Sequence, residues 1–484
     1  MDKDKADQVD QNKAPQPMAG AAGVEQPFAI TTPAAAGDSG RLANSTLYDV
    51  LVIGGGPGGS TAATLLAKKG LRVALLEKAR HPRFHIGESL LPANLPLFDE
   101  LGVGEAIRAI GVPKHAAEFV SPWHEQGSQT FSFAEAWNKD LPSAYQVLRS
   151  EFDEILIRNA ERQGVQVVEG CKVTGVELDG LPDDQVQATA LHDDGRKSQW
   201  TARFLVDASG RDTFLANRFK IKYPNPRHNS TAIYAHFKGA KRHPGAAQGN
   251  ITIFWFDYGW FWFIPLRDGI TSVGMVVWPH FLKTRGKRSL QQFFLDGIAL
   301  CPALAQRMAE ASMVSDVTAT GNYSYLSERN HGRNYVMIGD AYAFIDPVFS
   351  SGVWLAMKGG VFAADAIATL LRQPGQRQAA LQRFDERMRH GPREFSWFIY
   401  RISHPTMRDM FMSPSNKYRM KEALLSMLAG DIYDDTPIWP GVRKLKGAFY
   451  LLSLLNPKRT WLAWQKRKQD ITAIEGLLPR QTEY

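Results

Sequence analysis

The spacing of apolar residues near the start of the chain predicts a nucleotide-binding unit. Residues 48–53 (Tyr-Asp-Val-Leu-Val-Ile) form a short apolar run that is typical of a buried parallel strand. Residues 60–69 then show helical spacing, and residues 72–76 form a second apolar strand. Strand, helix and strand in this order predict a βαβ unit, and therefore an α/β fold with a doubly wound sheet.

A different pattern in the middle of the chain predicts a largely antiparallel sheet. Its strand candidates are β-branched and aromatic runs at residues 231–237, 251–256, 260–265 and 271–277. Within residues 259–265, Gly-Trp-Phe-Trp-Phe-Ile-Pro, period-two alternation places Trp260 and Trp262 on one face, and Pro265 ends the strand. Such a strand is either an ordinary core strand buried on both faces or a rigid aromatic wall beside a ligand.

A glycine-rich loop follows the first strand and indicates dinucleotide binding. In the G-x-G-x-x-G pattern, Gly54 permits the tight turn, Gly56 lets the backbone approach a pyrophosphate, and Gly59 lets the helix pack closely on the strand. Glu77, at the end of the second strand, is placed to accept hydrogen bonds from ribose hydroxyls. The candidate residues at this end are Gly54, Gly56, Gly58, Gly59, Ser60, Glu77 and Lys78.

A second motif far downstream indicates that the dinucleotide is FAD. A strand at about residue 335 leads into Gly339-Asp340, a loop, and a helix predicted over residues 353–371. The positive N-terminal end of that helix would stabilise an anionic reduced flavin, and Asp340 would bind ribityl or ribose hydroxyls. Gly-Asp alone also fits an ordinary turn. The candidates here are Gly339, Asp340, Pro347, Gly352 and Val353.

Because these two motifs must meet on one FAD, the flavin domain is predicted to be discontinuous. We expect it over residues 47–375, in pieces of about 47–110, 145–215 and 320–375, with the antiparallel substrate domain inserted at about 220–320. Residues 376–484 are expected to form a helical C-terminal region, and residues 1–46 a disordered tail. No stretch approaches the ~18 apolar residues of a membrane helix, so no membrane span is expected.

Charge and cysteine content add an expected compartment and an open question. The tail lacks a compact apolar signal segment, and the two cysteines are expected to be reduced, so the protein is predicted to be cytoplasmic. The net charge of +8 is concentrated near the C-terminus, where residues 443–468 contain eight basic residues and no acidic one. This stretch fits a solvated helix face, a membrane-surface patch or a dock for an acidic partner, whereas no motif supports nucleic-acid binding.

On these motifs the chain resembles the flavin-dependent halogenases, within a larger group of FAD proteins that includes the aromatic hydroxylases and geranylgeranyl reductases. The resemblance covers roughly residues 47–435. It rests on Gly54–Gly59, Arg83–Pro92, Arg149–Asp153, Asp207–Arg211, the Trp260/Trp262 strand and Gly339–Gly352. It implies an FAD-binding domain of the aromatic-hydroxylase and glutathione-reductase type, to which Glu88, Ser89, Arg149 and Asp207 contribute.

The resemblance also implies a reaction. Reduced FAD from a separate flavin reductase, O₂ and chloride or bromide would yield hypohalous acid, which travels to a lysine and then halogenates an electron-rich ring. Lys114 is the candidate, because residues 110–119 resemble the family's lysine segment. Ser351 and Gly352 would bind the halide. Trp260, Trp262 and Pro265 would separate the flavin from the substrate.

One departure from the family pattern bears on the substrate. Halogenases of free tryptophan carry an acidic residue where this chain has Phe349. The loop instead resembles that of halogenases acting on phenols or pyrroles, free or bound to an acyl or peptidyl carrier protein, in natural product biosynthesis. A basic C-terminal surface would suit an acidic carrier. The alternatives are a single-component FAD monooxygenase that hydroxylates an aromatic ring, and an inactive flavin-binding scaffold.

Overall fold

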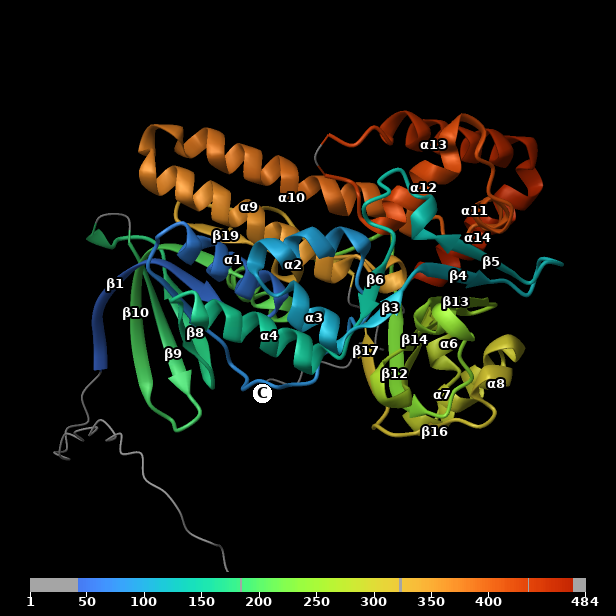
Figure 1. Cartoon of the computed structure of the whole chain (residues 1–484), viewed down its shortest axis with the longest axis horizontal. Coiled ribbons are helices and arrows are strands. Elements are labelled where there is room, and N and C mark those ends of the chain that lie inside the picture. Colours follow the sequence, from blue (N-terminus) through green and yellow to red (C-terminus); the bar gives the residue numbers. More distant parts are fainter. Residues whose placement is uncertain (1–41, 183–184, 322–323, 434, 473–484) are drawn as a thin grey trace, which may run out of the picture. The chain divides into compact units, whose positions relative to one another are not determined.

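The computed structural model describes residues 42–472, apart from residues 183–184, 322–323 and 434 (Figure 1). The tail predicted over residues 1–46 lies largely outside the described residues. Strand β1 (Leu42–Ile53) already begins within that predicted tail, and its last six residues are the apolar run that the sequence marks as a strand.

A seven-stranded sheet forms the nucleotide-binding part of the fold (Figure 1). Val50, Leu51 and Val52 of β1 have no exposed surface, which explains the continuous apolar run in the sequence. β1 pairs in parallel with one strand on each side, and the far edge of the sheet is an antiparallel hairpin. In spatial order the strands are β7 (Gln166–Val168), β2 (Val73–Leu76), β1, β10 (Lys197–Asp207), β9 (Val186–His192) and β8 (Cys171–Glu177), with β19 (Tyr335–Met337) also paired to β10.

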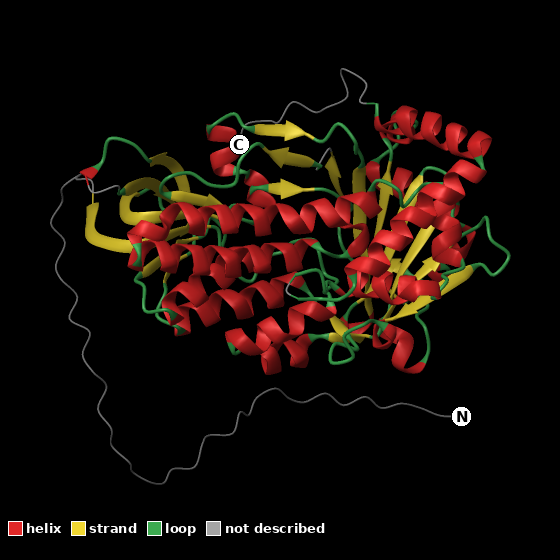
Figure 2. Cartoon of the chain, turned by 90° about the horizontal axis from the view of Figure 1, so that it is seen from above, coloured by secondary structure: helices red, strands yellow, loops and turns green. Residues whose placement is uncertain are grey.

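Long helices cover this sheet and lie side by side (Figure 2). α1 (Pro57–Lys68) packs against both α4 (Arg149–Arg162) and α9 (Gly352–Arg372), and α9 packs against α10 (Arg377–Ile399). Among the described residues, α9 alone is long and apolar enough to cross a membrane by length and composition. Since 67% of its apolar window is buried inside the molecule, α9 has the surroundings of a core helix.

The four strands predicted in the middle of the chain are confirmed and belong to an eight-stranded sheet. They are β12 (Thr231–Lys238), β13 (Ile251–Phe256), β14 (Gly259–Pro265) and β15 (Ile270–Val277), in antiparallel order β12-β15-β14-β13. An earlier segment extends the sheet, because β4 (Ala116–Val120) pairs in parallel with β13 and β5 (Ser128–Ser132) pairs with β4. β16 (Ser312–Met313) and β17 (Thr318–Gly321) pair with β12.

Strand β14 is buried on both faces, and its side chains alternate as predicted. Trp260 and Trp262 join the large core that also contains the helices of the flavin part. Phe261 and Phe263 join a separate core beneath the sheet, which is completed by α7 (Leu290–Ala299) and α8 (Pro302–Met308). The strand therefore forms the boundary between two cores.

From residue 377 to residue 472 the described part of the chain is largely helical, as predicted. Its first helix is α10, which continues through Pro392 and ends at Ile399. The later helices are α11 (Pro405–Met412), α12 (Met420–Ala429), α13 (Trp439–Leu455) and α14 (Pro457–Ile471). The remaining elements are α2 (Leu95–Leu101), α3 (Gly104–Ile110), β3 (Val112–Lys114), β6 (Ala144–Gln146), α5 (Phe214–Arg218), β11 (Lys222–Pro224), α6 (Pro279–Lys283), β18 (Tyr325–Ser327) and β20 (Ala343–Phe344).

The packing of Trp262 on the neighbouring strand gives a stability prediction. A Cβ atom at Gly274, directly opposite on β15, would lie 2.1 Å from Trp262 Cζ2. Gly274→Ala should therefore lower the free energy of unfolding by about 1–3 kcal/mol, the usual range for an overpacked core. Gly175→Ala in β8 is the matched control, because its Cβ would meet nothing within 4 Å. Equal urea midpoints for the two variants would contradict this account of the packing around Trp262.

Candidate active site

The glycine-rich loop is fixed by close backbone contacts. Gly54 has a φ of +98°, and a Cβ on it would lie 2.4 Å from Ala208 O. A Cβ on Gly59 would lie 1.9 Å from Gly54 O, and one on Gly58 would lie 2.9 Å from Ala356 O in α9. These three glycines hold β1, α1 and α9 together.

Gly56 differs from its neighbours, because neither its backbone conformation nor its packing requires glycine. Its φ is −72°, and a Cβ would have Arg83 Nη2, 3.7 Å away, as its nearest neighbour. The space in front of the α1 N-terminus is therefore open at the point where an anionic group would approach the backbone. Arg83 adds positive charge there. Its place in the Arg83–Pro92 motif was the only sequence signal for this residue.

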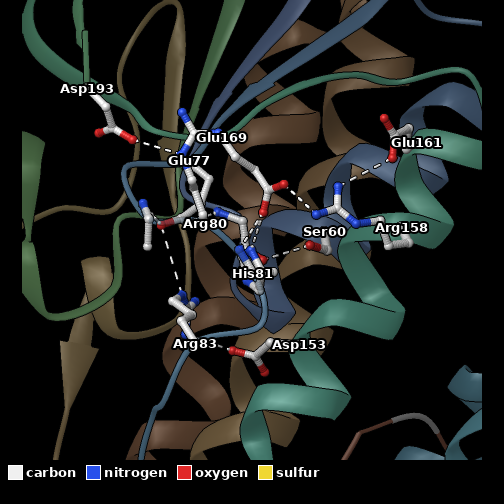
Figure 3. Close-up of polar contacts among 12 residues, drawn as sticks. Ser60, Glu77, Arg80, His81, Arg83, Asp153, Arg158, Glu161, Glu169 and Asp193 are labelled. Carbon is white, nitrogen blue, oxygen red and sulfur yellow. Dashed lines mark hydrogen bonds and ion pairs between the residues drawn. The ribbon is translucent and has the colours of Figure 1, made fainter. Parts of the chain in front are cut away.

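The acidic residue at the end of β2 lies beside the same arginine (Figure 3). Glu77 accepts hydrogen bonds from Gly55 N at 2.6 Å and Ala79 N at 2.8 Å, which fixes its carboxylate at the loop. Arg83 lies 4.0 Å from Glu77 and 3.1 Å from Asp153, so it links the two acids. The geometry at Gly56 and Arg83 fits the pyrophosphate of a dinucleotide.

Arg149 orders the loop that precedes the candidate flavin site. Its guanidinium binds both oxygens of Asp153, at 2.7 and 2.9 Å, and donates to Ile86 O at 2.9 Å. Burial alone would raise the pKa of Asp153, but Arg149 and Arg83 outweigh it and hold that pKa below its usual range. The ion pair thus stays charged and fixes the backbone at Ile86 and Gly87, just before Glu88 and Ser89.

Glu88 in that loop has one partner and one unsatisfied oxygen. Its Oε1 accepts from His236 Nε2 at 2.8 Å, whereas its Oε2 is buried without a hydrogen-bond partner among the described residues. Burial lowers the pKa of His236, but the hydrogen bond to Glu88 outweighs this and leaves that pKa raised. An unsatisfied buried carboxylate oxygen is unfavourable, so the site fits a ligand that donates a hydrogen bond.

The second cofactor motif lies against the start of α9. Gly339 has a φ of +55°, and a Cβ on it would lie 2.9 Å from the Cβ of Ala356. Tyr325 Oη donates to Asp340 O at 2.7 Å. Burial raises the pKa of the Asp340 carboxyl to about 6, against the opposing effects of Arg211 and Arg149. This acid is thus poised to exchange hydrogen bonds with a polar ligand.

The loop before α9 has the geometry of an anion site. Pro347 begins a short 3-10 turn (Pro347–Phe349), Ser350 follows in the left-handed region at φ 56°, and α9 starts at Gly352. The first helical bond runs from Leu355 N to Ser351 O, so the N–H groups of the first turn are available to an anion. A Cβ on Gly352 would have Phe344, 3.8 Å away, as its nearest neighbour, so the approach is open.

A cavity with an empty volume of about 550 Å³ adjoins this loop. Asp340, Asp346, Ser351 and Gly352 form its polar wall. Its apolar wall comes from α9, α10 and Tyr433.

A buried histidine–aspartate pair anchors the same loop, and no motif in the sequence indicates it. Asp346 Oδ1 accepts from Val348 N at 3.0 Å, and its Oδ2 accepts from His228 Nε2 at 2.7 Å. The side chains of His228 and Asp346 are 2% and 1% exposed. The two residues join the loop before α9 to the segment that leads into β12.

Lys114, the predicted lysine, is the last residue of β3 and is buried, with 1% of its surface exposed. Its Nζ donates to Ser89 Oγ at 2.9 Å and to Leu90 O at 2.9 Å, and it lies 5.3 Å from the ring centre of Phe133. Burial lowers the pKa of Lys114 to about 7, and no carboxylate among the described residues opposes that shift. A large share of this amine is therefore neutral near pH 7.

The two tryptophans form a fixed aromatic surface. Their ring centroids lie 6.1 Å apart, and the Trp262 ring lies 5.9 Å from that of Tyr234. Trp262 Nε1 donates to Ser272 Oγ at 3.1 Å, which fixes the orientation of the indole. With Pro265 closing the strand, the surface is rigid enough to act as a wall; its role as a partition between flavin and substrate stays a prediction.

Phe349 is surrounded by other aromatic rings. It is buried, with its ring centroid 6.5 Å from that of Phe395 and 6.4 Å from that of Phe411. The place where a tryptophan-specific enzyme would present a carboxylate is thus apolar here.

Four other predicted cofactor residues have partners within the protein. Asp207 is fully buried and accepts from Ser209 N and Leu215 N, so it holds the turn after β10. Lys78 forms an ion pair with Asp212 near the surface. Ser60 Oγ donates to Gly55 O at 2.9 Å. Ser89, predicted as a cofactor residue, is the hydrogen-bond partner of Lys114. The cofactor roles of these residues stay predictions.

The glycine cradle on a βαβ unit, a second helix N-terminus beside it and a buried amine define an FAD-binding enzyme. Comparison with known proteins identifies its family. The tryptophan halogenase family model matches residues 49–141 and 132–424. The chain therefore belongs to the tryptophan halogenase family of flavin-dependent halogenases, which are FAD-dependent oxidoreductases that use a halide. The predicted family, fold class, enzyme class and cofactor are confirmed.

Individual relatives support the same assignment. The chain is 32% identical to the tryptophan 2-halogenase of Chondromyces crocatus, over 90% of this chain and 83% of the relative. It is 29% identical to the 1H-pyrrole-2-carbonyl-[peptidyl-carrier protein] chlorinase of Pseudomonas fluorescens, over 80% and 90% of the two chains. The solved myxobacterial chondrochloren halogenase superposes with a TM-score of 0.69 at 33% identity, over 81% and 92%.

The open space at Gly56 gives a prediction for FAD binding. Gly56→Ala should leave the urea midpoint of the FAD-free protein nearly unchanged and raise the Kd for FAD about tenfold or more, because the methyl group fills the pyrophosphate approach. Gly59→Ala should instead lower the urea midpoint, since its Cβ clashes with Gly54 O at 1.9 Å. Normal FAD affinity in Gly56→Ala, measured by fluorescence titration, would contradict the placement of the cofactor.

The lowered pKa of Lys114 gives a pH-dependent stability prediction. Between pH 7 and 9 the unfolded chain holds a proton on this lysine that the folded protein largely lacks, so stability rises with pH. Lys114 should contribute roughly 2 kcal/mol to this rise in the wild type and nothing in Lys114→Met. Denaturant titrations of both proteins at pH 7 and pH 9 measure the rise in each. When the rise of the variant is subtracted from that of the wild type, the contributions of all other titrating groups cancel. An equal pH slope would show that the amine is not desolvated.

Proposed function

We propose that this halogenase oxidises chloride or bromide and transfers the halogen, as an electrophile, to an electron-rich phenolic or pyrrolic ring through Lys114. The observation that carries the proposal is the environment of that amine. It is buried, its pKa is lowered to about 7, and two fixed oxygen acceptors hold it.

The hydrogen bonds of Lys114 leave its lone pair unused. A neutral amine has two N–H groups, and Ser89 Oγ and Leu90 O accept both. The remaining lone pair can attack the halogen of hypohalous acid, which gives a haloamine and water. The aromatic ring then takes the halogen and its displaced proton leaves, which restores the amine. Ser89 is thus a positioning residue in this scheme.

The halide and the electrons enter at the other end of the site. When bound, reduced FAD, together with the halide, supplies the electrons that reduce O₂ to water. Ser351 and Gly352 would hold the halide at the N-terminus of α9, where the free N–H groups favour an anion. We infer that a separate flavin reductase delivers the reduced cofactor, as the resemblance to the family implies.

Phe349 supports a phenolic or pyrrolic substrate over free tryptophan. An apolar residue among aromatic rings offers no base, and phenols and pyrroles need less help because their own heteroatoms stabilise the cationic intermediate. One relative, the Pseudomonas fluorescens chlorinase, acts on a pyrrole held by a peptidyl carrier protein. Another relative is named for tryptophan, so tryptophan belongs among the substrates to be tested.

The activity test combines reduced FAD, a flavin reductase, O₂ and either halide with a panel of phenols, carrier-bound pyrroles and tryptophan. Wild-type protein should halogenate a phenol or pyrrole, and the rate should rise with pH through about 7 as Lys114 loses its proton. Lys114→Met should lower product formation at least about a hundredfold while O₂ is still consumed.

Lys172→Met, an exposed lysine on β8, is the matched control and should keep full activity. Halogenation by Lys114→Met at the wild-type rate would refute the role of Lys114. Hydroxylated product that forms without halide would instead indicate a monooxygenase, and tryptophan as the best substrate would refute the inference from Phe349.

A further inference from the structure

The junction of α13 and α14 exposes an unusual number of large apolar side chains. Every member of the set is more than half exposed, and Leu454 at 75% and Leu455 at 67% are the most exposed. The set is Leu451, Leu454, Leu455, Trp461, Leu462 and Trp464, here called the α13–α14 corner. Surface leucines and tryptophans occur singly on most proteins, but such a concentration marks an interaction site.

These side chains are not needed to hold the two helices in place. α13 buries Val442, Leu445 and Phe449 on its opposite face. α14 is anchored by Asp470, its buried residue, and by Arg459, which forms an ion pair with Asp409. The apolar residues of the corner therefore lie on faces that folding leaves in solvent.

The charge around the corner has one sign. Residues 436–469 contain no aspartate or glutamate. Lys446 pairs with Glu394, and Arg467 is partly buried and donates to Arg227 O. Five basic residues keep exposed side chains without an ion pair in the described part of the chain: Arg443, Lys444, Lys458, Lys466 and Lys468.

We propose that the α13–α14 corner binds the surface of a membrane that contains anionic phospholipids. Tryptophan rings favour the interface between headgroups and acyl chains, and leucines on a helix face insert just below it. Lysine and arginine side chains beside them reach the headgroup phosphates. The corner carries all three kinds of residue on two consecutive helices. Binding of this kind is peripheral and requires no spanning helix.

The same features disfavour other occupants. A two-fold contact with a second copy would bring the exposed basic residues of both chains together without acidic partners, which is repulsive. An acidic carrier protein would be matched by basic residues, but the most exposed positions are Leu454 and Leu455. A bilayer satisfies both the apolar residues and the positive charge.

Vesicle sedimentation of the full-length protein with FAD tests the proposal. Wild type should bind phosphatidylcholine vesicles that contain phosphatidylglycerol, at least about tenfold more tightly than pure phosphatidylcholine, and less tightly at high salt. Leu454→Glu/Leu455→Glu should lower binding at least about tenfold, because it places two carboxylates at the apolar surface. Leu300→Glu, at a 51% exposed leucine that follows α7, is the matched control and should bind normally.

Lys458→Glu/Lys468→Glu should weaken binding to the vesicles that contain phosphatidylglycerol but not to pure phosphatidylcholine vesicles. This result would separate the contribution of charge from that of the apolar residues. Failure of wild type to bind either vesicle, or an equal loss in the Leu300→Glu control, would overturn the proposal. It would also be overturned if the wild type bound a second copy of the chain or an acidic carrier protein instead of vesicles, and Leu454→Glu/Leu455→Glu abolished that binding. Halogenation of a free substrate needs no vesicles and is measured separately, so the outcome of the vesicle experiment does not affect the test of the proposed function.

Discussion

The burial of the Lys114 amine without a counter-charge is the constraint on which the rest of the site depends. A lysine in a protein interior favours its neutral form, and it keeps a defined geometry only where acceptors take its N–H groups. Ser89 and Leu90 provide those acceptors, and both lie in the loop that Arg149 holds through Ile86 O. The position of the amine is therefore set by an ion pair on α4.

The same ion pair reaches the nucleotide end. Asp153 binds both Arg149 and Arg83, and Arg83 lies beside Glu77 and the open space at Gly56. A continuous set of contacts thus runs from the pyrophosphate cradle to Lys114. The second sheet is attached to this set, because Asn250 Oδ1 accepts from the backbone N–H groups of the two residues after Lys114, each at 2.9 Å.

Local patterns in the sequence predicted most of the fold, because buried strands and glycine turns depend on near neighbours. Three strands of the flavin sheet (β1, β2 and β19), the four central strands and the alternation at Trp260 and Trp262 were predicted, whereas β7, β8, β9 and β10 were not. Pairing between distant segments was not: β4 and β5 extend the second sheet, and α10 continues through Pro392. The position of Lys114 came from family resemblance, whereas its contact with Ser89 and the His228–Asp346 anchor depend on tertiary packing between segments far apart in the sequence.

The most direct test of the central claim is to look for the halogen on the lysine. Wild type is supplied with reduced FAD, O₂ and bromide without an aromatic substrate, then digested and analysed by mass spectrometry. The account predicts one bromine in place of hydrogen on the peptide that contains Lys114, lost on addition of a phenol or pyrrole substrate and absent in Lys114→Met. Product formation by wild type with no halogen on that peptide, or equal labelling of Lys114→Met, would contradict it.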